Sequence, residues 1–184
     1  ELKTSIDTRI IGFIGRYSFE KRPEDFLKVA AMLNKDIDQY HFVMVGDGND
    51  DKNSELLNLI ASHGLENDIS LLGIREDIPS ILSSLDALVS TSVDEAFGLV
   101  LIESLACGCP CVSSNNEGAK SVGDRFINLV EKGDIEEFYR KIKALLSRDS
   151  KERFLLGEEA AKYIESNYSI EKVSARYLKL YGAL

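Results

Sequence analysis

The feature that most constrains this sequence is a regular alternation between short apolar runs and longer amphipathic stretches. Six runs have the length and composition of buried strands, and stretches with apolar residues at helical spacing separate most of them. This alternation is typical of an α/β fold with a doubly wound parallel sheet and helices on both faces. The six predicted strands are RIIGFIG (9–15), YHFVMVG (40–46), ISLLG (69–73), DALVSTS (86–92), PCVSS (110–114) and INLV (127–130).

Helices are predicted between these strands and at the C-terminal end of the chain. Gly64 suits the C-terminal side of a helix, because glycine adopts the left-handed conformation that often ends one. Asp134 with Glu137, and Asp149 with Glu152, have the spacing of a capping box at a helix start. The predicted helices are one that begins at Pro23, then residues 56–61, 77–85 and 98–107, and finally 134–148, 150–166 and 169–181.

Length and charge limit the class of protein. A chain of 184 residues suits one domain, which we expect to consist of a sheet core at about 9–148 and C-terminal helices at 149–184. No apolar run approaches the ~20 residues that cross a bilayer, and the N-terminal ELKTSIDTR lacks the features of a signal peptide. We therefore expect a cytoplasmic protein. A formal net charge of −9 argues against binding to nucleic acid.

The sequence offers no strong metal site. The three cysteines of CGCPC are odd in number and crowded, which indicates reduced thiols, and their spacing differs from the C-x(2)-C of zinc sites. The two histidines, His41 and His63, lie far from them. Asp36-Ile37-Asp38 has the D-x-D form of a metal clasp, but no apolar strand leads into it, so a solvated turn is the simpler interpretation. We expect no metal and no cofactor.

In open α/β sheets the ligand lies beyond the carboxyl ends of the strands. Gly15 lets the backbone approach an anion there, and Arg16 and Lys21 supply a planar fork and a point charge suited to a diphosphate, although a solvated basic loop is equally consistent. Gly46 and Gly48 are expected to form a tight turn, because GDGNDD lacks the third glycine of a dinucleotide site and the G-K-[ST] ending of a P-loop. The four loops selected by this rule are GRYSFEKRP, GDGNDDKN, GIREDIP and TSVDEAFG.

The stretch DEAFGLVLIESLACGCP places Glu95 and Glu103 on either side of a predicted helix start at Gly98. The free N–H groups of such a start favour an anionic or hydroxyl-rich ligand. The two carboxylates could serve as the acid and nucleophile of a glycoside hydrolase, but Glu103 lies on a helix flank rather than at a strand end. Each glutamate alone is consistent with a solvated acid. Together with the basic loop they indicate a ligand site.

These segments resemble the retaining, nucleotide-sugar-dependent glycosyltransferases of the GT-B fold that carry an E-x(7)-E motif (glycosyltransferase family 4, glycosyl transferases group 1). GRYSFEKRP is similar to the family's G-R-x(4)-K-G loop, VGDG to its V-G-x-G turn, and the block LLGIREDIPSILSSLDALVSTSVDEAFGLVLIESLACGCPCV to its longest signature. SIEKVSARYLKLY is similar to the closing segment, in which the last helix crosses back to the N-terminal domain. The resemblance implies one Rossmann-like half of a GT-B fold, with additional C-terminal helices.

The resemblance also implies a role for each candidate residue. Arg16 and Lys21 would hold the diphosphate of the donor, Glu103 would bind the ribose hydroxyls, and Glu95 would contact the donor sugar, either as nucleophile or by positioning it. Transfer would retain the anomeric configuration without a bound metal. The other implied donor contacts are Gly15, Gly46, Phe97, Gly98 and Leu99 near the phosphates and sugar, and Gly73, Ile74 and Arg75 along the nucleobase.

The implied donor is a UDP-, GDP- or ADP-sugar, used in polysaccharide, lipopolysaccharide or glycolipid synthesis. Only the donor-binding half is represented, so we expect an excised C-terminal domain that lacks the N-terminal acceptor domain and is inactive alone. Peripheral contact of the full enzyme with the inner face of a membrane stays open. Two other functions also stay open, namely a non-catalytic nucleotide-sugar-binding module and a sugar-nucleotide epimerase of the same architecture.

The sequence departs from the family's pattern in three places, two single residues and one segment. Arg22 stands where the first loop usually has glycine after its lysine, and Ala96 stands where glycine often follows the first glutamate. The segment NNEGAKSVGD lacks the usual proline-glutamate pair. The last departure concerns contacts on the sugar side of the implied site.

Overall fold

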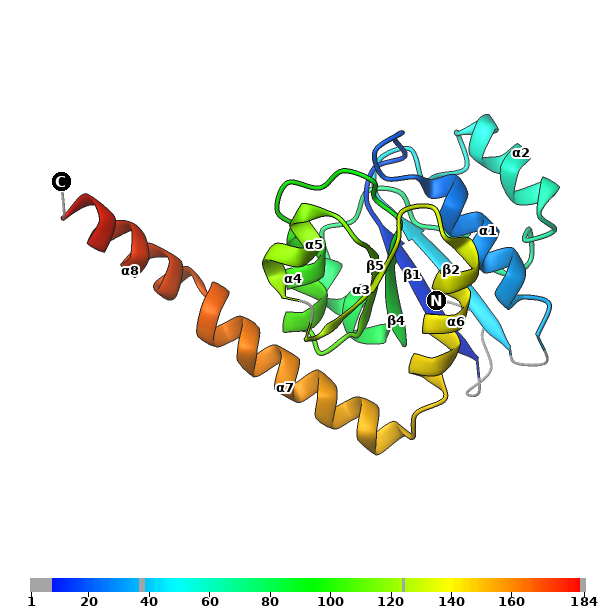
Figure 1. Cartoon of the computed structure of the whole chain (residues 1–184). Helices are drawn as coiled ribbons and strands as arrows, with labels where there is room; N and C mark the ends of the chain where they lie inside the picture. Colours follow the sequence, from blue (N-terminus) through cyan, green and yellow to red (C-terminus); the bar gives the residue numbers. More distant parts are fainter. Residues whose placement is uncertain (1–7, 37–38, 124, 183–184) are drawn as a thin grey trace.

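The computed structural model describes residues 8–36, 39–123 and 125–182 (Figure 1). The N-terminal segment 1–7, and Ile37 and Asp38 of the D-x-D sequence, lie outside the described residues. All six predicted strands are present, each within its predicted range, and all pair in parallel. The strands are β1 (Arg9–Ile14), β2 (Tyr40–Val45), β3 (Ile69–Leu71), β4 (Ala87–Ser90), β5 (Cys111–Ser114) and β6 (Ile127–Val130).

The order of the strands determines where a ligand site can form. The sheet has the order β3-β2-β1-β4-β5-β6, so the chain starts in the middle, moves to one edge, and then returns to build the other side. The direction changes between β1 and β4, which pair through Ile11 with Ala87 and Gly12 with Leu88. The loops that follow β1 and β4 therefore lie side by side at a topological switch point, where ligands bind in sheets of this kind.

Every helix predicted from the sequence is present, and one more occurs that was not predicted. Asp134 and Asp149 accept hydrogen bonds from the backbone N–H groups of Glu137 and Glu152, so the predicted caps are confirmed. The unpredicted helix, α5, is short and is capped by the side chain of Asn116. The helices are α1 (Pro23–Leu33), α2 (Ser54–Ser62), α3 (Ile78–Ser84), α4 (Leu99–Ala106), α5 (Glu117–Val122), α6 (Ile135–Leu146), α7 (Ser150–Tyr168) and α8 (Ile170–Tyr181).

Helices lie on both faces of the sheet (Figure 1), and an apolar cluster packs between the sheet and the helices on each face. The first packs β1 and β2 against α1, α2 and α6, with the buried rings of Phe13, Phe26 and Phe42 at its centre. The second packs β4 and β5 against α3, α4, α5 and α7. The predicted Rossmann-like α/β sheet with helices on both faces is therefore confirmed.

The cysteines belong to the second cluster. Cys109 and Cys111 are buried and Cys107 is half-buried, and none of the three forms a disulfide. Burial raises the pKa of the Cys109 thiol to about 12, so the thiol is neutral at physiological pH. Among the described residues, no three His, Cys, Asp or Glu side chains gather in a way that would hold a metal ion.

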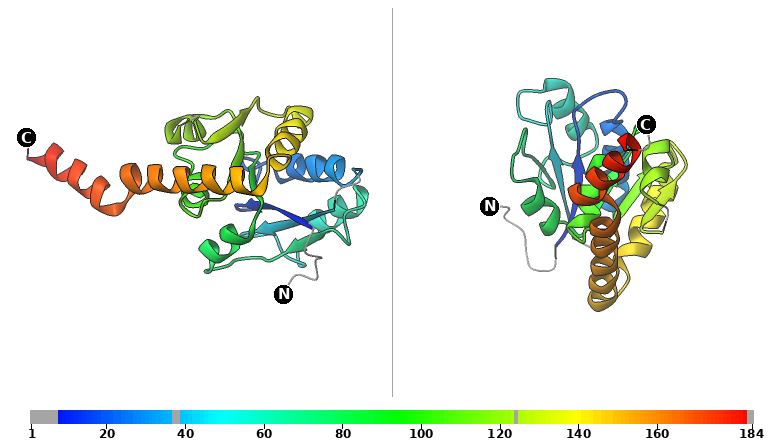
Figure 2. Two further views of the ribbon diagram at one scale, coloured as in Figure 1. Left: turned by 90° about the horizontal axis from the view of Figure 1, so that it is seen from below. Right: turned by 90° about the vertical axis from the view of Figure 1, so that its left-hand side faces the viewer.

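The last two helices differ in their packing. α7 lies against α4 and the turn that follows it, so closely that a Cβ on Gly157 would lie 2.5 Å from the carbonyl oxygen of Gly108. α8 then extends away from the domain (Figures 1 and 2), and none of its residues is buried. The apolar stripe predicted on it is present but is not covered. No helix within the described residues combines the length and apolar character of a membrane span.

Candidate functional site

The loops at the carboxyl ends of β1 to β5 form one hydrogen-bonded group, which we call the strand-end cluster. It consists of residues 15–22, 46–53, 72–77, 91–98 and 115–116. The first two loops are joined by their backbones, because Gly15 N–H donates to the carbonyl of Val45 at 2.9 Å and Tyr17 N–H donates to that of Asp47 at 2.8 Å. All four loops selected from the sequence are therefore part of one site.

Gly46 lies where two backbone segments meet. Its φ is +124°, and a Cβ at this position would lie 2.3 Å from the carbonyl oxygen of Gly15. Its N–H donates to the carbonyl of Gly73 at 2.7 Å. Only glycine fits this conformation and this spacing. The tight turn predicted at Gly46 is present, and the structure brings Gly15, Gly46 and Gly73 together.

Asn49 connects the same three glycine positions and was not singled out in the sequence. The residue is fully buried, its side-chain Nδ2 donates to the carbonyl of Gly15 at 2.7 Å, and its own carbonyl accepts from Gly73 N–H at 2.8 Å. Asparagine is common in turns, so the residue type alone does not indicate that this one joins separate loops.

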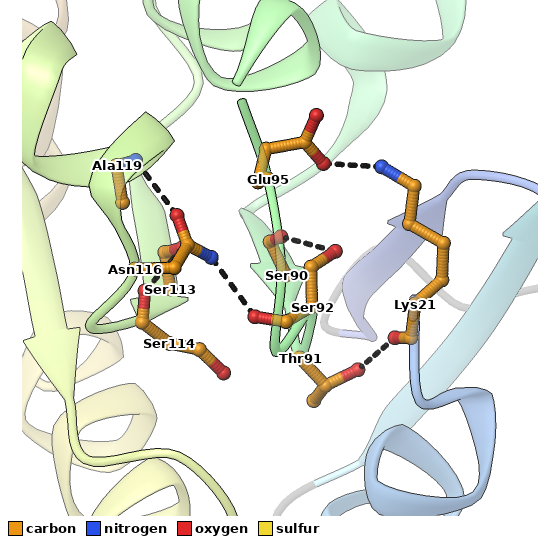
Figure 3. A network of polar contacts seen from close by, with 9 residues as sticks. All are labelled: Lys21, Ser90, Thr91, Ser92, Glu95, Ser113, Ser114, Asn116 and Ala119. Atoms are coloured by element: carbon orange, nitrogen blue, oxygen red, sulfur yellow. Dashed lines mark hydrogen bonds and ion pairs between the residues drawn. The ribbon is translucent and has the colours of Figure 1, made fainter. Parts of the chain in front are cut away.

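The most direct contact between the first and fourth loops is an ion pair of Lys21 with Glu95 (Figure 3). Each side chain is only 21% exposed, so solvent screens this pair less than a fully exposed one. Thr91 supports the contact by donating its hydroxyl to the carbonyl of Lys21 at 2.9 Å. The sequence analysis predicts both charged residues in one ligand site, and the structure shows that their side chains contact each other.

The loop that carries Glu95 is also held from the other side, by α5. Asn116 is buried, and its Nδ2 donates to the carbonyl of Ser92 at 2.9 Å while its Oδ1 accepts from Ala119 N–H (Figure 3). Gly118 N–H donates to the carbonyl of Glu95 at 2.8 Å, and a Cβ on Gly118 would lie 2.7 Å from that oxygen. This support was missed because α5 was not predicted in NNEGAKSVGD.

Gly98 precedes the first turn of α4, is buried against Gly118, and leaves that turn without a side-chain cap. The N–H groups at such a helix start favour an anionic ligand. Phe97 and Leu99 on either side are exposed. Glu103 lies farther along the helix and lines a groove of about 530 Å³ between α4 and α7. Partial burial raises the pKa of the Glu103 carboxyl. Glu95 and Glu103 therefore face different neighbours, as their spacing predicted.

The remaining candidate residues lie at the rim of the cluster. Arg16 and Ile74 are exposed. Arg75 is exposed but held in place by two hydrogen bonds to the carboxylate of Asp77, at 2.8 and 2.7 Å, and this pairing lowers the pKa of Asp77. Arg22 has a left-handed conformation with a φ of 51°, which explains why the loop it resembles usually has glycine at this position.

In chemical terms, the strand-end cluster combines close backbone turns, the cations Arg16 and Lys21, an open helix start and the carboxylate of Glu95 at a topological switch point. Such a site suits a ligand with both phosphates and hydroxyl groups. The cations and the helix start favour the anionic part, while a carboxylate accepts hydrogen bonds from hydroxyl groups.

The chain is similar to known proteins along nearly its whole length. The family described as Glycosyl transferases group 1 matches residues 2–166. The chain is 28% identical over 184 residues to the N-acetyl-α-D-glucosaminyl L-malate synthase of Bacillus anthracis, covering 98% of this chain and 47% of the relative. It is 31% identical over 170 residues to the UDP-Gal:α-D-GlcNAc-diphosphoundecaprenol α-1,3-galactosyltransferase of Escherichia coli, covering 85% and 43%. The chain thus spans about half the length of these curated relatives.

Solved structures show the same fold. The Anabaena protein Alr3699/HepE, crystallised in complex with UDP and glucose, is 25% identical and matches with a TM-score of 0.83 over 97% of this chain and 49% of its own. A glycosyltransferase from Rickettsia africae is 25% identical and matches with a TM-score of 0.84 over 95% of this chain and 47% of its own. In both proteins the matched part is about half of the molecule.

Proposed function

The chain belongs to the family of glycosyl transferases group 1, and on this premise we propose that it is the donor-binding half of an enzyme that transfers a sugar from a nucleoside-diphosphate sugar to an acceptor. The observation that carries the proposal is the meeting of Lys21 and Glu95 at the switch point between β1 and β4. One residue provides a cation for a diphosphate and the other a carboxylate for sugar hydroxyls. The Anabaena neighbour, which was crystallised with UDP and glucose, supports a ligand of this class.

We propose that the diphosphate binds between Arg16, Lys21 and the backbone of Gly15 and Gly46. A phosphate oxygen competes well for an ammonium group, because charge-assisted hydrogen bonds to phosphate are strong. Binding would then draw Lys21 away from Glu95 and leave the Glu95 carboxylate to accept hydrogen bonds from the sugar. The ion pair would thus hold both side chains in place before the donor arrives, which reduces the ordering cost of binding.

The other proposed donor contacts lie on and before α4 and on the loop after β3. Glu103, whose carboxylate is partly desolvated, would gain by accepting hydrogen bonds from the ribose hydroxyls. The N–H groups at the start of α4, around Phe97, Gly98 and Leu99, would face the phosphates and the sugar. The nucleobase would lie along Gly73, Ile74 and Arg75, where the pairing of Arg75 with Asp77 keeps the loop in one conformation.

We also propose that transfer retains the anomeric configuration and needs no metal ion. As the bond to the donor sugar breaks, negative charge accumulates on the departing diphosphate. Arg16 and Lys21 would offset this charge, because cations aimed at the place where charge develops stabilise the transition state. They would thereby supply the positive charge for which other enzymes use a divalent cation.

We propose that a second half binds the acceptor and that α8 packs against it. The curated relatives have about twice the length of this chain, and α8 exposes large apolar side chains that the described part of the chain does not cover. The class of acceptor would be a glycan or glycolipid under synthesis; the name of the Escherichia coli relative gives α-D-GlcNAc-diphosphoundecaprenol for that protein. Contact of the whole enzyme with a membrane surface would follow from a lipid-linked acceptor.

The test is calorimetric titration of this chain with UDP, GDP, ADP and their sugar conjugates. We expect one nucleotide to bind selectively, and we expect Arg16→Ala and Glu103→Ala each to weaken it by about tenfold or more, since loss of one charged contact is worth ~1.4 kcal/mol or more. Arg140→Ala is the control, because Arg140 is an exposed arginine on α6, outside the strand-end cluster. Binding that is insensitive to both site variants, or absent for every nucleotide, would contradict the proposal.

A further inference from the structure

Asn49 differs from Asn53 of the same loop because its side chain bonds outside that loop. Its side chain is fully buried, and Nδ2 lies 2.7 Å from the carbonyl oxygen of Gly15 and 3.3 Å from that of Val45. The side chain of Asn53 in the same loop caps α2, and its hydrogen bonds are to Gly48 and Leu56 nearby. Asn49 therefore acts between loops, whereas Asn53 acts within one.

The main chain of Asn49 completes a three-way junction. Gly73 N–H donates to the carbonyl of Asn49 at 2.8 Å, and Gly46 N–H donates to the carbonyl of Gly73 at 2.7 Å. One residue thus holds the loop after β1 through its side chain and the loop after β3 through its backbone. The separation between those two loops is fixed at this point.

The side chain also carries an unfavourable feature. Its Oδ1 is buried and has no hydrogen-bond partner among the described residues. A buried carbonyl without a partner lowers stability. The contribution of Asn49 to the site lies in what Nδ2 joins, and the carbonyl acceptor of Gly15 requires a donor that Asp lacks.

We propose that Asn49 is a positioning residue that sets the distance between the diphosphate-binding and nucleobase-binding parts of the donor site. The inference rests on the proposed function, in which Arg16 and Lys21 follow Gly15 and the nucleobase lies along Gly73. A nucleoside diphosphate must contact both loops at once. Displacing one loop by ~1 Å would break the match and can cost up to ~10²-fold in a process that depends on such geometry.

The experiment compares Asn49→Ala and Asn49→Asp with Asn34→Ala in this same chain. Asn34 is a matched control, because its Nδ2 also joins segments 34 residues apart, donating to Asp68 at 2.8 Å, but outside the strand-end cluster. Affinity for the nucleoside diphosphate that the unmodified chain prefers is measured at a temperature where all variants are folded by circular dichroism. Backbone amide resonances of Arg16 and Ile74 are recorded without nucleotide.

We expect both Asn49 variants to weaken binding by about tenfold or more and to shift the Arg16 and Ile74 resonances. Asn34→Ala should bind within about twofold of the unmodified chain and leave those resonances in place. A merely structural role would lower the melting temperature in all three variants alike and would leave affinity in the folded state unchanged.

The outcomes separate this inference from the proposed function. If folded Asn49 variants bind as well as the unmodified chain, the inference is wrong and the proposed function stands. If the unmodified chain binds no nucleotide, the proposed function fails, and unmoved Arg16 and Ile74 resonances would also overturn the positioning role. If Asn49→Ala and Asn49→Asp do not fold, the nucleotide affinity and the Arg16 and Ile74 resonances are measured on Asn49→Ser, whose side chain is shorter. Weaker binding with shifted resonances supports the positioning role, and unchanged affinity or unmoved resonances overturn it.

Discussion

The strand-end cluster and the helix α8 use their side chains in opposite ways. In the cluster, buried or nearly buried polar groups such as Asn49, Asn116 and Thr91 bond across loops that are distant in sequence. In α8 no residue is buried, and Leu178 is 72% exposed. The polar groups of the first region thus bond to one another, whereas α8 exposes apolar side chains that the described residues do not bury.

This difference has an energetic meaning. Burial of apolar surface stabilises a protein by roughly 25 cal/mol per Å², and α8 gains little of it here. An isolated helix of this length is marginal in water, so α8 relies on its cap at Ser169 and on the end of α7. The cluster by contrast is held by many short contacts. Substitutions should therefore cost much in the cluster and little in α8.

The largest effect is expected from Gly46→Ala. The new Cβ would lie 2.3 Å from the carbonyl oxygen of Gly15, in a backbone conformation that side chains rarely adopt. We expect the free energy of unfolding to fall by about 3 kcal/mol or more, measured by urea denaturation. Gly64→Ala is the control, because its φ is +68° but nothing lies within 4 Å, and it should cost only about 1 kcal/mol. If both substitutions lowered the free energy of unfolding equally, the close packing of Gly46 on Gly15 would not be the cause of the loss at Gly46.

The contrast between the two glycines shows what the sequence can and cannot predict. Short apolar runs predicted every strand, because a strand that is covered on both faces of a sheet is apolar along its length. Gly64 was recognised from its place after a helix. The contact of Gly46 with Gly15 depends on the pairing of β1 with β2, and the ion pair of Lys21 with Glu95 joins residues 74 positions apart. Such contacts leave no local pattern, so only the residue types could be predicted.

The helix α5 was missed for a related reason. It has only six residues, one of which is Gly118, and glycine is unfavourable inside a helix. The cap at Asn116 was the available signal, but asparagine is equally common in turns. The tight contact of Gly118 with the loop of Glu95 explains the glycine, and that contact is visible only in the folded chain.

Asn116→Ala tests the polar support of the cluster and should have the next largest effect. The change removes the cap of α5 and leaves the buried carbonyl of Ser92 without its donor. We expect a loss of about 2 kcal/mol in the free energy of unfolding. Asn53→Ala removes a helix cap in a more exposed position and should cost about 1 kcal/mol. If Asn53→Ala were the more costly change, the bond from Asn116 to Ser92 would not be a main support of the cluster.

Glu103→Gln should have a smaller effect, with a defined dependence on pH. Burial raises the pKa of Glu103 in the folded state above its unfolded value, so the charged carboxylate disfavours folding. The variant should therefore be slightly more stable at pH 7, by no more than about 0.5 kcal/mol given the exposure of this side chain. The difference should shrink as the pH falls through the folded pKa and vanish below about 4. Thermal melts at pH 7 and pH 4 measure this difference. A variant that is less stable than the unmodified chain at pH 7 would contradict the prediction.

The smallest effect is expected from Leu178→Ala on α8. Because Leu178 is 72% exposed, its truncation removes little buried surface, and the free energy of unfolding should change by less than about 0.5 kcal/mol. The matched change Leu101→Ala, at a position on α4 that is 1% exposed, should cost about 3 kcal/mol. Urea denaturation of both variants gives the comparison. A similar loss at both leucines would mean that α8 packs on the domain in solution and that the two regions do not differ as described. If the same pair is measured with a second half added to the chain, a rise in the cost at Leu178 toward the cost at Leu101 would show that the added half covers α8.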